Sequence, residues 1–152
     1  MMINKIIWLT GQPGSGKTTL AKHLKDKMKI SYSDKDIMIV DGDDLRDITV
    51  NKDYSKKGRE SNIRTAQKIA KFLYNKNFIT IVALVAPYIQ LREEFKKFTP
   101  VLEVFLSTTD IRGREHFFAK DYEPPKKNFL HIDTGEHSVA ESIELIIKNL
   151  GD

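Results

Sequence analysis

The feature that most constrains the fold is the stretch GQPGSGKT, residues 11–18, together with the segments on either side of it. It matches the pattern G-x-x-x-x-G-K-[ST] and follows a short apolar run at residues 5–10, which is typical of a buried strand. Residues 18–29 then carry apolar side chains at helical spacing. A strand, a glycine-rich turn and a helix in this order form a loop whose backbone N–H groups face a phosphate. The pattern therefore predicts binding of a nucleoside triphosphate.

The residue types inside this loop each have a physical reason. Glycines allow the tight backbone turns, Lys17 reaches the β- and γ-phosphates, and the hydroxyl of Thr18 is a ligand for Mg²⁺. The predicted ATP-binding residues are Gly11, Gly14, Ser15, Gly16, Lys17, Thr18 and Thr19. The alternative is a glycine-rich turn that only caps a helix, and the flanking strand, helix and later carboxylates disfavour it.

Apolar runs and amphipathic stretches alternate along the rest of the chain. Further strands are predicted at 36–42, 78–86, 101–107 and 128–133, and further helices at 58–76, 89–98 and 138–150. The most hydrophobic run, 78–86, is expected to be the central strand, and the charged stretch 110–121 to be partly helical. Near-continuous apolar strands alternating with helices predict an α/β fold of the three-layer P-loop NTPase type, with a five-stranded parallel sheet and helices on both faces. The length of 152 residues predicts one domain, 1–152, with a short lid segment at about 110–127.

Composition excludes several classes of site and partner. The chain has no cysteine, so it has neither disulfides nor thiolate metal sites, and a cytoplasmic setting is expected. No signal peptide or transmembrane run is expected, so no membrane partner is predicted. The net charge of +4 and pI near 9.2 suit a protein that binds anions, but the basic residues are scattered and predict no nucleic-acid surface. The four histidines lack metal-ligand spacing and are expected to be structural or surface residues.

Carboxylates follow the second predicted strand in the stretch IVDGDDLR, residues 39–46. Asp41 and Asp43 fall where ligands of parallel sheets bind, beyond the carboxyl ends of the strands. One carboxylate is expected to ligate Mg²⁺, directly or through water, and another to accept the proton of an acceptor hydroxyl. Arg46, about one helical turn beyond Asp43, is expected to bind an anionic group of the acceptor. An N-cap aspartate followed by a solvated acidic turn remains the alternative.

The kind of phosphate-loop protein follows from what else the chain contains. A regulatory GTPase needs N-K-x-D after a later strand, and NKDY at 51–54 has the wrong order and follows no predicted strand. Motors and helicases usually need a longer chain. A small-molecule kinase is therefore expected, by analogy at the level of the fold.

Six stretches then resemble the adenylylsulfate kinase family in order and spacing, over nearly the whole chain. They are GQPGSGKTTL, VDGDDLR, YSKKGRESNIR, VAPYIQLRE, DYEPP and LHIDT. The resemblance implies transfer of the γ-phosphate of MgATP to the ribose 3′-hydroxyl of adenylylsulfate. It implies Asp43 as general base, so that the predicted catalytic residues are Asp43, Lys17 and Asp41 and the predicted metal ligands are Thr18 and Asp41.

The resemblance also implies an acceptor site. Arg46 would bind the anionic linkage, Arg59 and Asn62 would make further contacts, and Tyr54 would lie near the acceptor base. The turn formed by Ala86, Pro87 and Tyr88 would line the pocket through its backbone. Asn62 has poor helix propensity, which favours a functional role over a solvated helix face. The family often forms homodimers, so a homodimer is a possible assembly.

Two departures from the family pattern concern the acceptor. The family helix D-R-x-E-N-I-R-R becomes residues 58–65, GRESNIRT, and the family's adenine-closing lid segment before DYEPP is deleted. Phe117 or Phe118 could replace its stacking, and Arg112, Arg114 or Lys120 could supply its positive charge. The deletion weakens adenine recognition specifically, so two acceptors stay open: adenylylsulfate and cytidine diphosphoramidate, a substrate of related enzymes in capsule phosphoramidate pathways.

Two further hypotheses come from other functional classes. The chain could be a nucleotide-binding module without catalysis, which the intact loop, carboxylates and Arg46 disfavour. It could be a nucleic-acid 5′-kinase, which salt-sensitive oligonucleotide binding would indicate.

Overall fold

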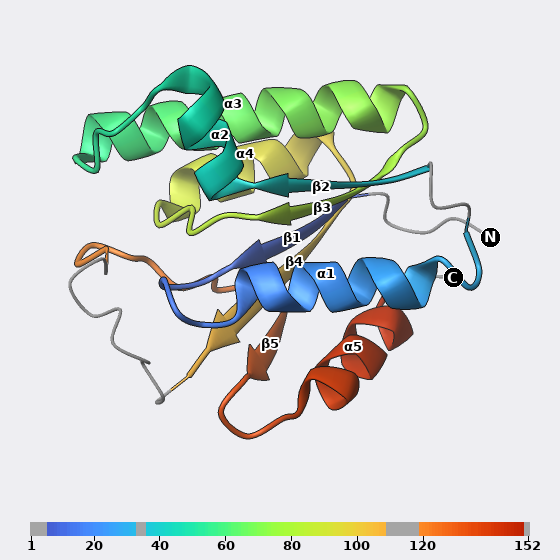
Figure 1. Ribbon diagram of the computed structural model, residues 1–152. Helices are drawn as coiled ribbons and strands as arrows, with labels where there is room; N and C mark the ends of the chain where they lie inside the picture. Colours follow the sequence, from blue (N-terminus) through green and yellow to red (C-terminus); the bar gives the residue numbers. More distant parts are fainter. Residues whose placement is uncertain (1–5, 33–35, 109–118, 151–152) are drawn as a thin grey trace.

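A parallel sheet of five strands forms the centre of the computed structural model, which describes residues 6–32, 36–108 and 119–150 (Figure 1). The strands are β1 (Ile6–Thr10), β2 (Ile37–Asp41), β3 (Ile79–Ala83), β4 (Val101–Ser107) and β5 (Phe129–Asp133). The helices are α1 (Lys17–Met28), α2 (Gly42–Thr49), α3 (Lys56–Asn75), α4 (Ile89–Phe98) and α5 (Val139–Lys148). The predicted α/β three-layer fold is confirmed. No helix in the described ranges is long and apolar enough to span a bilayer.

Helices cover both faces of the sheet, with α1 and α5 on one face and α2, α3 and α4 on the other (Figure 1). The strand order is β2-β3-β1-β4-β5, so β1 is central and β3 lies between β1 and β2. The prediction that the run 78–86 forms the central strand is therefore wrong. Every residue of β1 is buried, and so is every residue of β3. The hydrophobicity of the two strands therefore does not indicate which of them is central.

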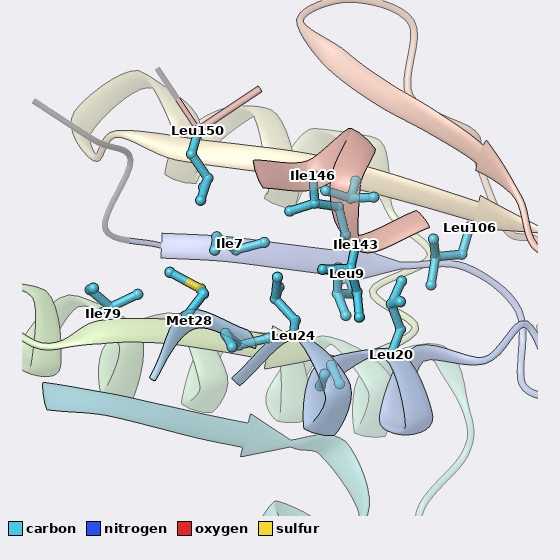
Figure 2. Close-up of a cluster of buried hydrophobic side chains, with 14 of the residues drawn as sticks. Ile7, Leu9, Leu20, Leu24, Met28, Ile79, Leu106, Ile143, Ile146 and Leu150 are labelled. Atoms are coloured by element: carbon cyan, nitrogen blue, oxygen red, sulfur yellow. The ribbon is translucent and has the colours of Figure 1, made fainter. Parts of the chain in front are cut away.

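Alternate residues of β1 enter two separate hydrophobic clusters. Ile7 and Leu9 point toward Leu24 of α1 and Ile146 of α5 (Figure 2). Their neighbours along the strand belong to the cluster on the α3 and α4 face. The two clusters pack both layers of helices against one strand, so the loop that follows β1 starts from a fully buried strand.

Two local features differ from the sequence prediction, and a third prediction falls mostly outside the described residues. The acidic residues after β2 form the helix α2, whose N-cap is Asp41; its carboxylate accepts a hydrogen bond from the Asp43 N–H at 2.9 Å. Strand β3 ends at Ala83, three residues earlier than predicted, and an irregular loop follows it. Most of the stretch 110–121 lies outside the described residues, and its described end begins a turn.

The carboxyl ends of β2, β3 and β1 lie side by side at one edge of the sheet. Asp41 pairs with Ala83 in the strand register, and Ala83 pairs in turn with Leu9. Because all the strands are parallel, the loops after these three strands meet at this edge. The phosphate loop, the carboxylates and the turn after β3 are thereby brought together.

Candidate functional site

A cavity of about 400 Å³ lies at this edge, between the phosphate loop, α2, α3 and the loop after β3. Thirteen predicted site residues line it: Gly14, Gly16, Lys17, Thr18, Thr19, Asp41, Asp43, Arg46, Tyr54, Arg59, Asn62, Ala86 and Pro87. Four predicted residues do not line it: Gly11, Ser15, Tyr88 and Lys120. Arg112 and Arg114 lie outside the described residues, as do Phe117 and Phe118. One cavity therefore joins the expected donor and acceptor sides.

The phosphate loop has the backbone that its glycines predict. The φ angles of Gly11, Gly14 and Gly16 are 151°, 87° and 97°. The ammonium of Lys17 donates hydrogen bonds to the carbonyl oxygens of Gly11 and Gln12, both at 2.9 Å. The Lys17 side chain thus folds back over the loop from the first turn of α1. At this helix end the backbone N–H groups and the helix dipole favour an anion.

We expect replacement of Gly11 to lower the stability of the fold, although Gly11 does not line the cavity. A Cβ at this position would lie 2.3 Å from the Leu106 carbonyl oxygen, and the φ angle of 151° is also unfavourable for alanine. We expect Gly11→Ala to cost about 1–3 kcal/mol for the backbone conformation alone, which lowers Tm by roughly 2–4 °C per kcal/mol. Thermal unfolding followed by circular dichroism measures the change.

Gly16→Ala is the matched control for this substitution. Its φ angle of 97° imposes comparable backbone strain, but its Cβ would meet only the Thr134 methyl carbon, at 3.9 Å. Gly11→Ala should therefore unfold at a lower temperature than Gly16→Ala. Equal Tm values for the two variants would show that the Leu106 contact has no influence.

Two oxygen atoms suited to Mg²⁺ lie side by side, one at the start of α1 and one at the end of β2. The Thr18 hydroxyl donates a hydrogen bond to the Asp41 carboxylate at 2.8 Å, while the other oxygen of Asp41 accepts from the Asp43 N–H. Mg²⁺ prefers such hard oxygen ligands, and it is usually bound by one or two protein oxygens with water and phosphate oxygens completing the shell. Within the described residues, no group of three or more His, Cys, Asp or Glu side chains is placed to hold a metal ion. The pair therefore fits a nucleotide-bound Mg²⁺ and not a metal site made by protein alone.

Asp43 and Arg46 project from successive turns of α2. The Asp43 carboxylate is exposed at the cavity and makes no hydrogen bond to a described residue. Arg46 donates from Nη1 to the carbonyl oxygens of Asn51, at 3.1 Å, and Asp53, at 3.0 Å. Burial lowers the pKa of Arg46 below its ordinary value, but an arginine stays protonated in proteins. The guanidinium is therefore a fixed positive charge that also holds the loop after α2.

Tyr54 contacts two arginines at the cavity wall. The Arg46 guanidinium carbon is 4.0 Å from the centre of its ring, and that of Arg59 is 5.7 Å away. Arg59 also donates from Nε to the Tyr54 carbonyl oxygen at 2.9 Å. Aromatic faces attract guanidinium groups at such distances. The two positive charges are thereby held near each other, despite their repulsion, on one side of the cavity.

Gly58 explains one departure from the family pattern. A Cβ at this position of α3 would lie 2.1 Å from the Asp53 carbonyl oxygen. The loop between α2 and α3 packs so closely that the family's aspartate does not fit here. Asp53 in turn accepts the hydrogen bond from Arg46, so the glycine permits the approach that orients the arginine.

Asn62 is the buried polar side chain of the cavity wall. It is 4% exposed, and its Oδ1 has no hydrogen-bond partner in the described structure. Buried polar atoms are nearly always satisfied, so an orphaned one at a cavity points to a ligand that is absent. The position inside α3 fits the prediction that this asparagine has a reason other than helix propensity.

The loop after β3 has an unusual backbone. Ala86 has a φ angle of 45°, in the left-handed region that residues other than glycine rarely adopt. Ala86 and Pro87 line the cavity, whereas Tyr88 is buried behind them. Burial, with a smaller contribution from the Asp121 carboxylate, raises the pKa of Tyr88 to about 12. Tyr88 therefore stays a neutral phenol and supports the loop from behind.

Sequence reasoning missed several residues of this site. Further residues line the cavity: Pro13, Gly42, Ile63, Ala83, Leu84 and Val85. The side-chain amide of Gln12 both donates to the Ala119 carbonyl, at 2.9 Å, and accepts from the Ala119 N–H, at 3.0 Å. Gln12 occupies a variable position of the loop pattern, so the pattern contains no signal for this contact.

Comparison with protein families and curated relatives gives a consistent result. The family model described as adenylylsulphate kinase matches residues 3–133. A cytidine diphosphoramidate kinase of Campylobacter jejuni is 28% identical over 164 aligned positions, which cover 95% of this chain and 95% of the relative. An adenylyl-sulfate kinase of Synechococcus is 30% identical over 164 positions, covering 95% of this chain and 93% of the relative.

A solved structure supports the fold. The APS kinase of Mycobacterium tuberculosis, in complex with AMPPNP and APS, superposes with a TM-score of 0.84 at 24% identity. The superposition covers 100% of both chains.

Proposed function

Because the chain belongs to the adenylylsulphate kinase family of ATP-dependent phosphotransferases, we propose that it transfers the γ-phosphate of ATP to the ribose 3′-hydroxyl of a nucleotide. The observation that carries the proposal is a cavity of about 400 Å³ that both the phosphate loop and the residues Asp43, Arg46 and Asn62 line. Phosphoryl transfer depends mainly on positioning and electrostatic stabilisation, and a shared cavity supplies both.

The donor side binds the triphosphate. The N–H groups at the start of α1 would bind its phosphates, and Lys17 would exchange its loop carbonyl partners for β- and γ-phosphate oxygens. Thr18 and Asp41 would hold Mg²⁺, which neutralises charge on the phosphates when bound. Ser15 is buried and would contribute through its backbone.

The acceptor side presents a base and two cations. The exposed carboxylate of Asp43 would accept the proton of the attacking hydroxyl, because it is free of competing hydrogen bonds to described residues. Arg46 and Arg59 would bind an anionic group of the acceptor. Asn62 would satisfy its orphaned oxygen with an acceptor hydroxyl or amino group.

Adenylylsulfate is the acceptor that we propose first, because it is the family's substrate. Cytidine diphosphoramidate is the second candidate, and two observations favour it. The chain lacks the family's adenine-closing segment before DYEPP. The chain is also similar to a cytidine diphosphoramidate kinase over 95% of both sequences. Both acceptors have a ribose 3′-hydroxyl and an anionic tail, so the same base and arginines serve either one.

Steady-state ADP release with MgATP, over a concentration series of each nucleotide, distinguishes them. We expect phosphorylation of one acceptor with a kcat/KM at least about tenfold above that of the other, equivalent to about 1.4 kcal/mol of differential transition-state binding. A preference for adenylylsulfate supports the first assignment, and the reverse preference supports the second. ATP hydrolysis that neither nucleotide stimulates would contradict both.

A further inference from the structure

A buried ion pair lies behind the cavity wall without lining it. Arg92 of α4 is 4% exposed and Glu103 of β4 is 1% exposed. Arg92 donates from Nε to one carboxylate oxygen of Glu103 at 2.8 Å, and Lys96 donates to the other at 2.7 Å. Neither Arg92 nor Glu103 lines the cavity. The pair is therefore outside the proposed substrate site.

The remaining donors of Arg92 reach two backbone segments. Nη1 donates to the Ala86 carbonyl oxygen at 2.6 Å, and Nη2 donates to the Glu123 carbonyl oxygen. The guanidinium carbon also lies 5.4 Å from the centre of the Tyr122 ring. One buried side chain thus joins the turn that lines the cavity to residues 119–125, which we call the bridging segment.

The bridging segment contacts the same turn directly. The Glu123 N–H donates to the Pro87 carbonyl oxygen at 2.8 Å, and the Glu123 carboxylate accepts from the Ile89 N–H at 3.0 Å. The helix α4 has no side-chain cap from its own N-cap residue, Tyr88, so Glu123 supplies that partner from a distant part of the chain. The carbonyl groups of Ala86 and Pro87 and the N–H of Ile89 are therefore held by two residues, Arg92 and Glu123, that do not line the cavity.

The other end of the bridging segment is attached to the donor side. Ala119 pairs with Gln12 of the phosphate loop through both of its backbone groups. The Thr10 hydroxyl donates to the Val85 carbonyl at 2.6 Å, so the hydroxyl of Tyr122 is the donor in its 2.9 Å hydrogen bond to Thr10. The bridging segment therefore connects the phosphate loop with the acceptor turn.

The buried pair of Arg92 and Glu103 is expected to fix the shape of the turn more than it stabilises the fold. A buried ion pair gains little net free energy, because desolvation offsets the attraction between the charges. The left-handed conformation of Ala86 is strained and persists only where neighbouring contacts impose it. Arg92, which binds the carbonyl of that residue, is the contact best placed to impose it.

We propose that Arg92 is a positioning residue for the acceptor, which acts through the backbone of Ala86 and Pro87. Glu123 of the bridging segment holds the same turn through its own hydrogen bonds to Pro87 and Ile89. That the 86–88 turn contacts the acceptor is part of the proposed function, and the role of Arg92 in acceptor binding rests on it. Arg92 touches no substrate in this scheme. It sets the shape of the wall against which the acceptor nucleotide lies.

Arg92→Lys tests the role while keeping a positive charge beside Glu103. Lysine has no planar fork of donors, so it cannot reach Glu103, Ala86 and Glu123 at once. We expect the acceptor KM to rise about tenfold, with the KM for ATP and kcat changed less than about twofold, which is the signature of lost acceptor binding. An unchanged acceptor KM, or an equal rise in both KM values, would overturn the proposal.

Glu123 provides a second test with a matched control, and its side chain is exposed, so replacing it leaves no cavity in the core. Glu123→Ala removes the acceptor for the Ile89 N–H, whereas Glu123→Gln keeps an oxygen in the same place. We expect Glu123→Ala to raise the acceptor KM about fivefold and Glu123→Gln to restore most of the wild-type value. The same KM for both variants would contradict the role assigned to this hydrogen bond.

A crystal structure of Arg92→Lys separates this proposal from the proposed function. If wild-type protein phosphorylated neither nucleotide, the proposed function would fail, but the geometric claim would still be tested. We expect Ala86 to leave the left-handed region, or the 86–88 turn to shift, when Arg92 is replaced. An unchanged turn would show that Arg92 does not position it.

Discussion

Replacing Asp43 by Asn is expected to lower kcat by about 10²–10⁴-fold, the usual contribution of a general base. The amide keeps the size of the side chain but cannot accept the proton of the attacking hydroxyl. The Asp43 N–H would still bond to Asp41, so α2 should keep its start and the cavity its shape. The KM values for ATP and for the acceptor should therefore change little.

Asp44→Asn is the matched control for this experiment. Asp44 is an exposed carboxylate one residue further along α2, and it does not line the cavity. It should leave kcat within about twofold of wild type, as expected for a surface change away from the reacting atoms. Rapid-quench measurement of a single turnover isolates the chemical step. Equal activity of Asp43→Asn and Asp44→Asn would remove Asp43 from the mechanism.

Replacing Lys17 by Met is expected to lower kcat/KM by at least about 10²–10³-fold, the typical cost of losing one preorganised charge in a transition state. Methionine is similar in length but carries no charge. Because the Lys17 ammonium also bonds to the carbonyls of Gly11 and Gln12, the loop should lose part of its order as well. The KM for ATP should therefore rise together with the fall in kcat, unlike the result for Asp43→Asn.

Lys22→Met separates loss of this one contact from loss of general positive charge. Lys22 is an exposed residue of α1 outside the cavity. It lowers the net charge by the same amount and should leave both kinetic constants nearly unchanged. Binding of a non-hydrolysable ATP analogue, measured by calorimetry, reports the donor side without the chemistry. Similar losses in Lys17→Met and Lys22→Met would indicate a long-range electrostatic effect.

Much of the fold could be predicted because its signals are local. The first strand, the glycine loop and α1 are encoded by neighbouring residues, and the alternation of apolar runs with amphipathic stretches indicated the parallel sheet. The order of the strands in the sheet depends instead on contacts between distant segments, and the hydrophobicity of each strand does not indicate that order. The run 78–86 is more apolar than β1, yet β1 is central.

The helix α2 shows another limit of local signals. It has eight residues and one buried side chain, Leu45, so it gives no apolar stripe. Its start depends on the Asp41 carboxylate, which a sequence pattern reads equally well as a metal ligand or as a cap. In the structure Asp41 caps the helix and contacts Thr18 at the same time, so the two interpretations were compatible.

The candidate site could be predicted where residues belong to motifs and missed where they act over long range. Lys17, Asp43 and Asn62 lie at positions that the loop pattern and the family resemblance identify, and all three line the cavity. Arg92 lies in an ordinary amphipathic helix, and its partners are 6, 11 and 31 residues away along the chain. Only the packing of α4 against β4 and the bridging segment shows that this arginine is buried and fully bonded.

The position of the transferred phosphate tests the central claim most directly. Phosphorus NMR of the product, formed from MgATP and whichever nucleotide stimulates ADP release, identifies the phosphorylated oxygen through its coupling to a ribose proton. The account predicts a new phosphomonoester signal coupled to the proton on the ribose 3′ carbon. A phosphate on another oxygen of the nucleotide, or inorganic phosphate as the sole product, would contradict it.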